Sequence, residues 1–145
     1  MRPASNLAGS RFEIWQGTIM NIRSLFCEQA PRPVGPYSQA VEASPFIFIS
    51  GQIPLDPQTG EVVGQTTAEQ ALRSLKNINA ILAAAGLDFS RLVKVTVFLR
   101  HMADFAQFNE VYQKELGGAA PARSVVEVSS LPKGVLVEIE AVACR

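Results

Sequence analysis

Apolar residues recur at helical spacing between residues 68 and 85, which predicts an amphipathic helix there. Thr67, followed three residues later by Gln70, has the pattern of a capping box at the helix start. Gly86 can supply the left-handed residue that ends many helices. The expected buried stripe consists of Ala71, Leu72, Leu75, Ile78, Ile81 and Leu82.

A second helix is expected after Asp104, which can either cap the helix or enter its first turn. Gly117 and Gly118 should end it, since paired glycines favour a left-handed stop. Its apolar stripe consists of Phe105, Phe108, Val111, Tyr112 and Leu116. Two helices with one apolar stripe each can cover one face of a sheet.

Runs of apolar and β-branched residues predict strands in the remaining chain. The expected strands cover residues 46–50, 92–99, 123–128 and 135–143, with a further extended piece after Gly51 that ends at the turn beginning with Asp56. Along 92–99 one face should carry Val93, Val95, Val97 and Leu99, and the other Lys94, Thr96 and Phe98. The element order predicts an α+β fold in which two helices cover one face of a mixed sheet.

The second face of that sheet has no helix left to cover it. Along 135–143, the residues expected under the helices are Val135, Val137, Ile139 and Ala141, and those expected on the other face are Leu136, Glu138, Glu140 and Val142. That second face mixes apolar and acidic side chains. We therefore expect another copy of the chain to cover it, which would partly bury its carboxylates.

Composition bounds the class of protein. The chain has 145 residues, 48% hydrophobic and 18% charged, which is typical of one globular domain. No apolar run approaches the roughly 20 residues of a membrane span, so we expect a soluble protein that does not engage a membrane. Thirteen basic residues balance thirteen acidic ones without a basic stripe, so no nucleic acid partner is expected.

Cysteine and histidine usage argues against a structural metal site. Cys27, Cys144 and His101 are the only residues of these two types, too few for grouped zinc ligands, so no metal is expected. A disulfide could join only the two distant ends of the chain, and a reducing, cytoplasmic setting is the simpler interpretation. His101 has no nucleophile or acid at triad spacing, so no catalytic role is assigned to it.

Residues 1–19 differ from the rest of the chain, with neither strand alternation nor a helical stripe before a second methionine, Met20. We expect them to be a disordered extension or a non-native start, and residues 20–145 to form a single domain. Arg2, Arg11 and Arg23 with few acids also fit, less well, an organelle-targeting peptide.

Arg123 and Glu138 are the strongest candidates for chemistry. Arg123 begins a strand directly after Pro121 and Ala122, where packing can orient a guanidinium to bind a carboxylate in two parallel hydrogen bonds. Its structural alternative is an ion pair with Glu127. Burial of Glu138 under a neighbouring subunit would raise its pKa toward the range useful for proton transfer.

Several alternatives stay open at the candidate site. Glu138 could instead form a buried ion pair with Lys94 or with Arg123 of a neighbour. Tyr37 follows a rigid loop of proline and glycine and could either cover a ligand or serve in packing. Asn109 interrupts the second apolar stripe and could either cap a backbone group or reach the site.

Four motifs, in order, resemble those of the RidA/YjgF family: GPYSQ at 35–39, SGQIP at 50–54, PARS at 121–124 and VEIEA at 137–141. The resemblance runs from about Cys27 to Arg145. It implies a chorismate-mutase-like α+β subunit that forms a homotrimer around a central β-barrel, with an active site in each cleft between subunits.

The resemblance also implies an activity that needs no cofactor. This is the hydrolytic deamination of reactive enamines and imines such as 2-aminoacrylate to 2-keto acids and ammonia, a form of metabolite damage control. Such an enzyme is a 2-iminobutanoate/2-iminopropanoate deaminase. The alternatives are a protein that binds small 2-keto acids without turnover and, further away, a ribonuclease or chaperone-like member.

The resemblance assigns roles to individual residues. It implies that Arg123 binds the substrate carboxylate and that Glu138 positions or activates the attacking water. The residues implied to line the pocket are Tyr37, Gly51, Asn109 and Val125. Many family members have cysteine where this chain has Val125, so a thiol is absent there. The loop at 117–120 is also expected to be short, which could alter the preferred substrate size.

Overall fold

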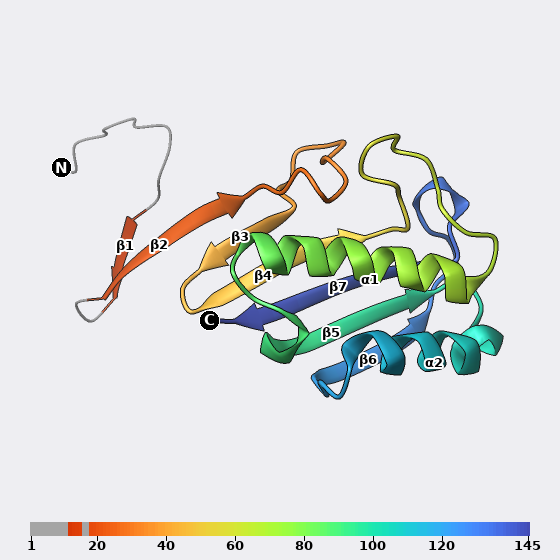
Figure 1. The fold of residues 1–145 in the computed structure, drawn as a ribbon. Helices are drawn as coiled ribbons and strands as arrows, with labels where there is room; N and C mark the ends of the chain where they lie inside the picture. The colour runs from red at the N-terminus through yellow and green to blue at the C-terminus, as the bar shows by residue number, and fades with distance from the viewer. Residues whose placement is uncertain (1–11, 16–17) are drawn as a thin grey trace.

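The computed structural model describes residues 12–15 and 18–145, with side chains from residue 21 onward. Its strands form one seven-stranded sheet in the order β1-β2-β3-β4-β7-β5-β6. The strands are β1 (Phe12–Trp15), β2 (Thr18–Leu25), β3 (Ala40–Ala43), β4 (Phe46–Gln52), β5 (Leu92–Leu99), β6 (Ala122–Glu127) and β7 (Val137–Cys144). The hairpin of β1 and β2 projects from the body of the molecule (Figure 1).

The sheet is mixed, as predicted. β6 runs parallel to β5, and the other neighbouring strands pair antiparallel. The last strand, β7, lies between β4 and β5 and thereby joins the first and second halves of the chain. The candidate residues of the C-terminal third therefore sit at the centre and at one edge of the sheet.

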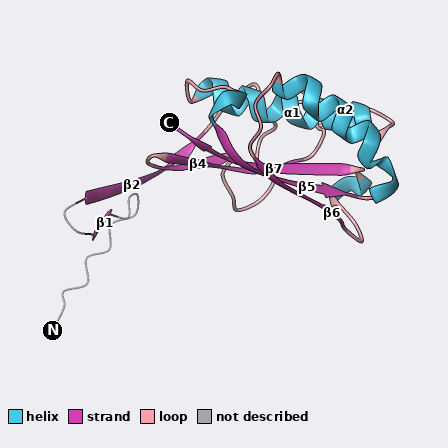
Figure 2. Ribbon diagram, turned by 90° about the horizontal axis from the view of Figure 1, so that it is seen from below, coloured by secondary structure: helices cyan, strands magenta, loops and turns pink. Residues whose placement is uncertain are grey.

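Both helices lie on one face of the sheet, and the opposite face carries no helix among the described residues (Figure 2). These helices are α1 (Thr67–Ala84) and α2 (Phe105–Leu116), and the short 3-10 turns are η1 (Phe89–Arg91), η2 (Met102–Asp104) and η3 (Pro132–Gly134). The core between helices and sheet includes Leu75, Ile78, Leu82, Phe108, Val97 and Ile139. The predicted α+β class and the one-sided helical cover are confirmed.

The predicted faces of the C-terminal strand are also confirmed. Val135, Val137, Ile139 and Ala141 are buried beneath the helices. The uncovered face presents large apolar side chains to solvent within a single chain. Phe46, Phe48 and Val126 are each more than a third exposed there.

The sequence did not predict the strands at the start of the chain. β1, β2 and β3 were not expected, and the extended piece after Gly51 forms only an isolated bridge between Leu55 and Val62. β1 and the start of β2 fall within residues 1–19, where side-chain alternation gave no strand signal. The extension was expected to be disordered, but its residues 1–11 and 16–17 lie outside the described residues.

The capping box of α1 begins one residue earlier than predicted. Thr66 has extended backbone angles, its side chain accepts a hydrogen bond from the Glu69 amide, and the Glu69 carboxylate accepts from the Thr66 amide. Thr67 instead donates its hydroxyl proton to Asp104, 2.6 Å away. The prediction on Thr67 and Gln70 is therefore wrong, because both side chains are used in tertiary contacts. Gly86 follows the helix with a φ of +76°, in the left-handed region expected of it.

The predicted orientation of one β5 residue, Val93, is also wrong. The pairing of β5 with β7 shifts register between Leu92 and Lys94. This irregularity turns Leu92 inward and leaves Val93 40% exposed, whereas Val95, Val97 and Leu99 are buried as predicted.

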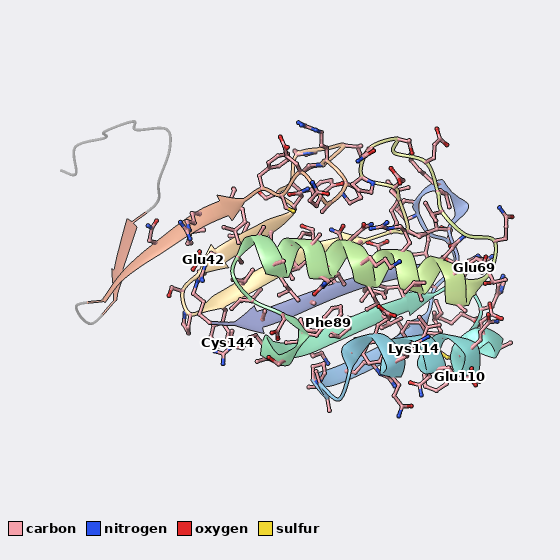
Figure 3. All side chains as sticks on the ribbon, viewed as in Figure 1. Glu42, Glu69, Phe89, Glu110, Lys114 and Cys144 are labelled. Carbon is pink, nitrogen blue, oxygen red and sulfur yellow. The ribbon has the colours of Figure 1, made fainter. Side chains whose placement is uncertain are left out.

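A buried carboxylate on β3 links β2 to the last residue of the chain. Glu42 on β3 accepts hydrogen bonds from Arg23 on β2 and from the C-terminal residue Arg145. These two guanidinium groups lower the pKa of Glu42 to about 2. Figure 3 labels Glu42 at the end of the sheet where Cys144 also lies.

Candidate functional site

The Arg123 side chain is oriented by residues of α2. Its Nη1 donates a hydrogen bond of 2.8 Å to Oδ1 of Asn109. Its Cζ lies 4.6 Å from the ring centroid of Tyr112 and 5.7 Å from that of Phe105. The two rings and the amide together hold the guanidinium in place against the helix.

The alternative ion pair for Arg123 is not formed within the chain. The Glu127 carboxylate accepts a hydrogen bond from the Met102 amide, and Lys94 donates to Ser124. Among the described side chains, the ion pairs are the two on Glu42. The guanidinium of Arg123 therefore keeps donors that a ligand can use.

Arg123 faces a cavity of about 530 Å³ between α2 and β6, hereafter the arginine cavity. Its other lining residues are Asn109, Tyr112, Gln113, Gly118, Ala119, Ala120 and Pro121. The loop that was expected to influence substrate size thus forms one wall. A cavity with a fixed guanidinium suits a small organic acid.

Glu138 lies on β7, on the face that the helices do not cover. Its carboxylate packs against the backbone of Gly51, and a Cβ at position 51 would overlap Oε1 and lie 3.0 Å from Cδ of Glu138. The ladder between β4 and β7 is irregular here, because the pairing shifts between Ile49 and Gln52. A glycine at this bulge is therefore required by the position of the acid.

Burial is the main cause that raises the pKa of Glu138, and the charge of Glu140 raises it further. No positive side chain among the described residues pairs with Glu138, so the proposed ion pair with Lys94 is absent within the chain. A carboxyl group with a raised pKa is better suited to exchange protons with water near neutral pH.

Glu138 lines a second cavity, of about 490 Å³, hereafter the acid cavity. The other lining residues are Val34, Tyr37, Ser50, Gly51, Ile53, Pro132 and Glu140. Tyr37 is half exposed, and its hydroxyl accepts a hydrogen bond of 3.4 Å from the Val34 amide. Tyr37, Gly51 and Glu138 therefore line the same cavity.

The loop that carries Tyr37 is held by the buried side chain of Gln39. Its Nε2 donates to the carbonyl oxygens of Cys27, Ala30 and Pro31, and its Oε1 accepts from the Cys27 amide. Ser50 adds a hydrogen bond to the Ser38 carbonyl. These contacts fix the loop without using regular secondary structure.

Within one chain, the two candidate catalytic residues do not meet. Arg123 is level with Val95 in the parallel ladder, and its side chain contacts α2 on the helix-covered face. Glu138 is level with Phe98 and points to the other face, between the buried Val137 and Ile139. The arginine cavity and the acid cavity are thus separate within one chain.

Of the two remaining predicted site residues, only one lines a cavity. Asn109 lines the arginine cavity, whereas Val125 packs against the core and lines neither cavity. Sequence reasoning treated Phe105 and Tyr112 only as core residues. Their spacing from Asn109, four residues before and three after, could have indicated a shared helix face.

Cys27 and Cys144 are both free thiols. Among the described residues, no helix combines the length and the apolar character needed to cross a bilayer. In that same part of the chain, no three histidine, cysteine or acidic side chains are grouped as metal ligands would be.

Comparison with known proteins identifies the family of this chain. A family model described as Endoribonuclease L-PSP matches residues 27–145. A RutC family protein from Pyrococcus horikoshii is 56% identical over 121 residues, covering 83% of this chain and 96% of that protein. A mouse protein named 2-iminobutanoate/2-iminopropanoate deaminase is 49% identical over 117 residues, covering 81% of this chain and 87% of that protein.

The fold also matches a solved structure. Escherichia coli TdcF with bound serine superposes with a TM-score of 0.80 at 44% identity, covering 85% of this chain and 98% of that one. The YjgF-like subunit fold expected from the sequence motifs is thereby confirmed. On these matches, the chain belongs to the RidA/YjgF family, whose family model is described as Endoribonuclease L-PSP.

Proposed function

We propose that this chain hydrolyses small imino acids, and the enamines that tautomerise to them, to 2-keto acids and ammonia. The observation that carries the proposal is the placement of the Arg123 guanidinium. Asn109 and Tyr112 orient it toward a cavity, and it has no carboxylate partner among the described side chains. The name of the mouse relative supports the same reaction class.

The complete site is proposed to form between subunits of a homotrimer. Arg123 and Asn109 of one subunit would face Tyr37, Gly51 and Glu138 of the next. In this proposal the arginine cavity and the acid cavity are each a half-site, and their separation on opposite sheet faces supports the arrangement. The exposed Phe46, Phe48 and Val126 support it too, because their apolar face needs a cover.

The proposed reaction is simple in its chemistry. Arg123 binds the carboxylate of the imino acid and so fixes the electrophilic carbon close to Glu138. The imine reacts in its nitrogen-protonated iminium form. Glu138 takes a proton from water as the water oxygen bonds to the iminium carbon, which gives a neutral carbinolamine. Glu138 then returns that proton to nitrogen, the C–N bond breaks, and the carbonyl forms as the hydroxyl proton passes to the released ammonia. One water is consumed, and the nitrogen leaves as ammonium.

A coupled assay tests the proposal. A threonine dehydratase acting on serine supplies 2-aminoacrylate, and pyruvate release is followed with and without the purified chain. The wild type should accelerate release over the spontaneous rate, and Arg123→Ala should abolish the acceleration. Arg91→Ala is the matched control, because Arg91 is exposed and lines neither cavity. Absence of acceleration by the wild type would reject the proposal.

A second candidate function is binding of small 2-keto acids without turnover. The serine-bound state of Escherichia coli TdcF favours it, because that relative holds a small carboxylate ligand. It predicts saturable binding of pyruvate that Arg123→Ala removes, together with no rate acceleration in the coupled assay. Wild-type acceleration that depends on Arg123 and Glu138 would decide for the hydrolase.

A further inference from the structure

Two polar side chains of α1 are buried between the helix and the sheet. Gln70 is 5% exposed and Asn77 is 0% exposed. They lie about two helical turns apart, so both are on the same face of the helix. Figure 1 shows that α1 lies over β7 and β4, which it also contacts. Amide groups on this face can therefore reach backbone at the ends of those two strands.

Gln70 holds the segment that leads into β7. Its Oε1 accepts a hydrogen bond of 2.7 Å from the Leu136 amide, and its Nε2 donates to the Gly64 carbonyl at 3.1 Å. The Arg100 amide donates to the Leu136 carbonyl. Leu136 precedes Glu138 by two positions, so these bonds fix the backbone from which the acid projects.

Asn77 holds the segment that leaves β4. Its Nδ2 donates to the carbonyl oxygens of Leu55 at 3.0 Å and of Ile53 at 3.4 Å. Arg73 donates to the Asn77 Oδ1 from Nε at 3.1 Å and from Nη2 at 2.8 Å, which fixes the orientation of the amide. Because β4 ends at Gln52, Asn77 supplies hydrogen bonds to the residues just beyond the strand.

The two held segments meet at Glu138. The segment that Gln70 holds continues into the strand that carries this acid. The segment that Asn77 holds includes Ile53, which lines the acid cavity, and follows Gly51, whose backbone packs against the Glu138 carboxylate. A shift of either segment therefore changes the contact between Gly51 and the acid.

We propose that Gln70 and Asn77 are positioning residues for imine hydrolysis, because from the helix side of the sheet they hold Glu138 against Gly51. This inference rests on the proposed function and adds residues that act on the acid without touching the substrate. A displacement of about 1 Å at a catalytic group can lower the rate by roughly a hundredfold. Neither residue lines the arginine cavity or the acid cavity, so carboxylate binding by Arg123 should be unaffected by their replacement.

Two shape-conserving variants test the proposal by kinetics. Asn77→Leu removes both donors to the segment after β4, and Gln70→Met removes the acceptor for the Leu136 amide. Each should lower kcat by about tenfold or more and change KM by less than about twofold. Wild-type kcat in a folded Asn77→Leu, or a rise in KM at unchanged kcat, would overturn the inference.

Two controls on the same helix separate positioning from a general loosening of α1. Ile81→Val removes one methylene from the buried core without changing a hydrogen bond. Ser74→Ala removes a buried hydroxyl that has no hydrogen-bond partner among the described residues. Both should keep the wild-type kcat. A loss of kcat in Ile81→Val as large as that in Asn77→Leu would contradict a positioning role.

Titration of Glu138 needs no turnover, so it separates failure of this inference from failure of the proposed function. The carboxyl-carbon NMR resonance of Glu138 is assigned by its absence from Glu138→Gln and is followed against pH. Burial is the main cause that raises the pKa of Glu138, and a loosened contact with Gly51 admits water. The pKa should therefore fall toward the ordinary glutamate value in Asn77→Leu and in Gln70→Met, but not in Ile81→Val.

The variants leave the charged and titratable side chains around Glu138 in place, so a changed pKa reports the position of the carboxyl. These side chains are Glu140, Tyr37, Lys94, Arg32 and Lys133, with Arg123 of the neighbouring subunit in the proposed homotrimer. A lowered pKa supports the positioning of Glu138 even if the wild type hydrolyses no imine. An unchanged pKa in both folded variants refutes it even if hydrolysis is observed.

Discussion

Arg123 and Glu138 lie on opposite faces of the same sheet. Arg123 contacts Asn109 and Tyr112 on α2, whereas Glu138 points away from the helices and packs against Gly51. A small imino acid cannot span the sheet between them within one chain. If the two residues act on one substrate, the acid must come from a neighbouring subunit.

Replacement of Tyr112 should weaken carboxylate binding. Its ring lies 4.6 Å from the Arg123 Cζ, so Tyr112→Leu removes an aromatic face worth about 0.5–2 kcal/mol and should raise KM by roughly 2- to 30-fold. Tyr112→Phe keeps the face and should keep KM. Steady-state kinetics with melting curves checks this, and a KM that rises equally in the two variants would contradict the role of the ring.

Replacement of Gly51 should displace the catalytic acid. A Cβ at this position would overlap Oε1 of Glu138, so Gly51→Ala should lower kcat by about tenfold or more. Gly35→Ala is the matched control, because a Cβ there meets only the Tyr37 ring, at an ordinary 3.5 Å.

The double variant Gly51→Ala, Glu138→Gln gives a further check. If Gly51 acts only through Glu138, the double variant should be no slower than Glu138→Gln alone. Additive losses in kcat would show that Gly51 serves another purpose.

The pH dependence of imine hydrolysis should reflect the ionisation of Glu138. Burial first and Glu140 second raise the pKa of Glu138, so the ionised form that accepts a proton from water is lost at a higher pH than for an ordinary glutamate. The rate should therefore fall as the pH drops through this raised value. Glu140→Gln removes a cause of the shift and should move the acid limb of kcat/KM to lower pH. A limb that stays in place or moves upward would contradict the assignment.

Stability at low pH should depend on Glu42. Arg145 and Arg23 lower its pKa from 4.5 to about 2, so its contribution is complete above pH 4.5 and is lost as the pH falls toward 2. Glu42→Gln should reduce the free energy of unfolding at neutral pH by roughly 1–3 kcal/mol. The same variant should also show a smaller fall in the free energy of unfolding between pH 4.5 and pH 2 than the wild type. Denaturant titrations at several pH values measure both effects.

The parts of the fold that follow a strong side-chain period were predictable. The stripes of α1 and α2 and the alternation of β7 identified most of the buried residues, because one face of each is packed against the core. Leu72 is only partly buried, and Phe105 stays 36% exposed beside Arg123. β2 and β3 were missed because the described side chains of β2 are mostly exposed, and the inward positions of β3 are Ala40 and Glu42, which give no apolar alternation. The facing of Val93 was missed because a bulge depends on the partner strand.

Most residues of the candidate site were predictable, but Val125 lines neither cavity and the place of Tyr112 beside Arg123 was missed. Arg123, Glu138, Tyr37, Gly51 and Asn109 all line one of the two cavities. The face of β7 that carries Glu138 followed from the alternation of that strand. The strand order, which places β6 and Arg123 at the edge of the sheet beside α2, is a tertiary property that one strand's sequence does not carry.

A mixing experiment tests the intersubunit site most directly. Arg123→Ala and Glu138→Gln should each be inactive, but each retains the half-site that the other lacks. When equal amounts are unfolded together and refolded, random association gives about one quarter of the intersubunit sites both an intact arginine and an intact glutamate. We therefore predict that about a quarter of wild-type imine hydrolysis returns in the mixture, and only in the mixture. The wild type, refolded in the same way, serves as the control. If it is active but the correctly assembled mixed oligomers recover no activity, the result contradicts a site shared between subunits.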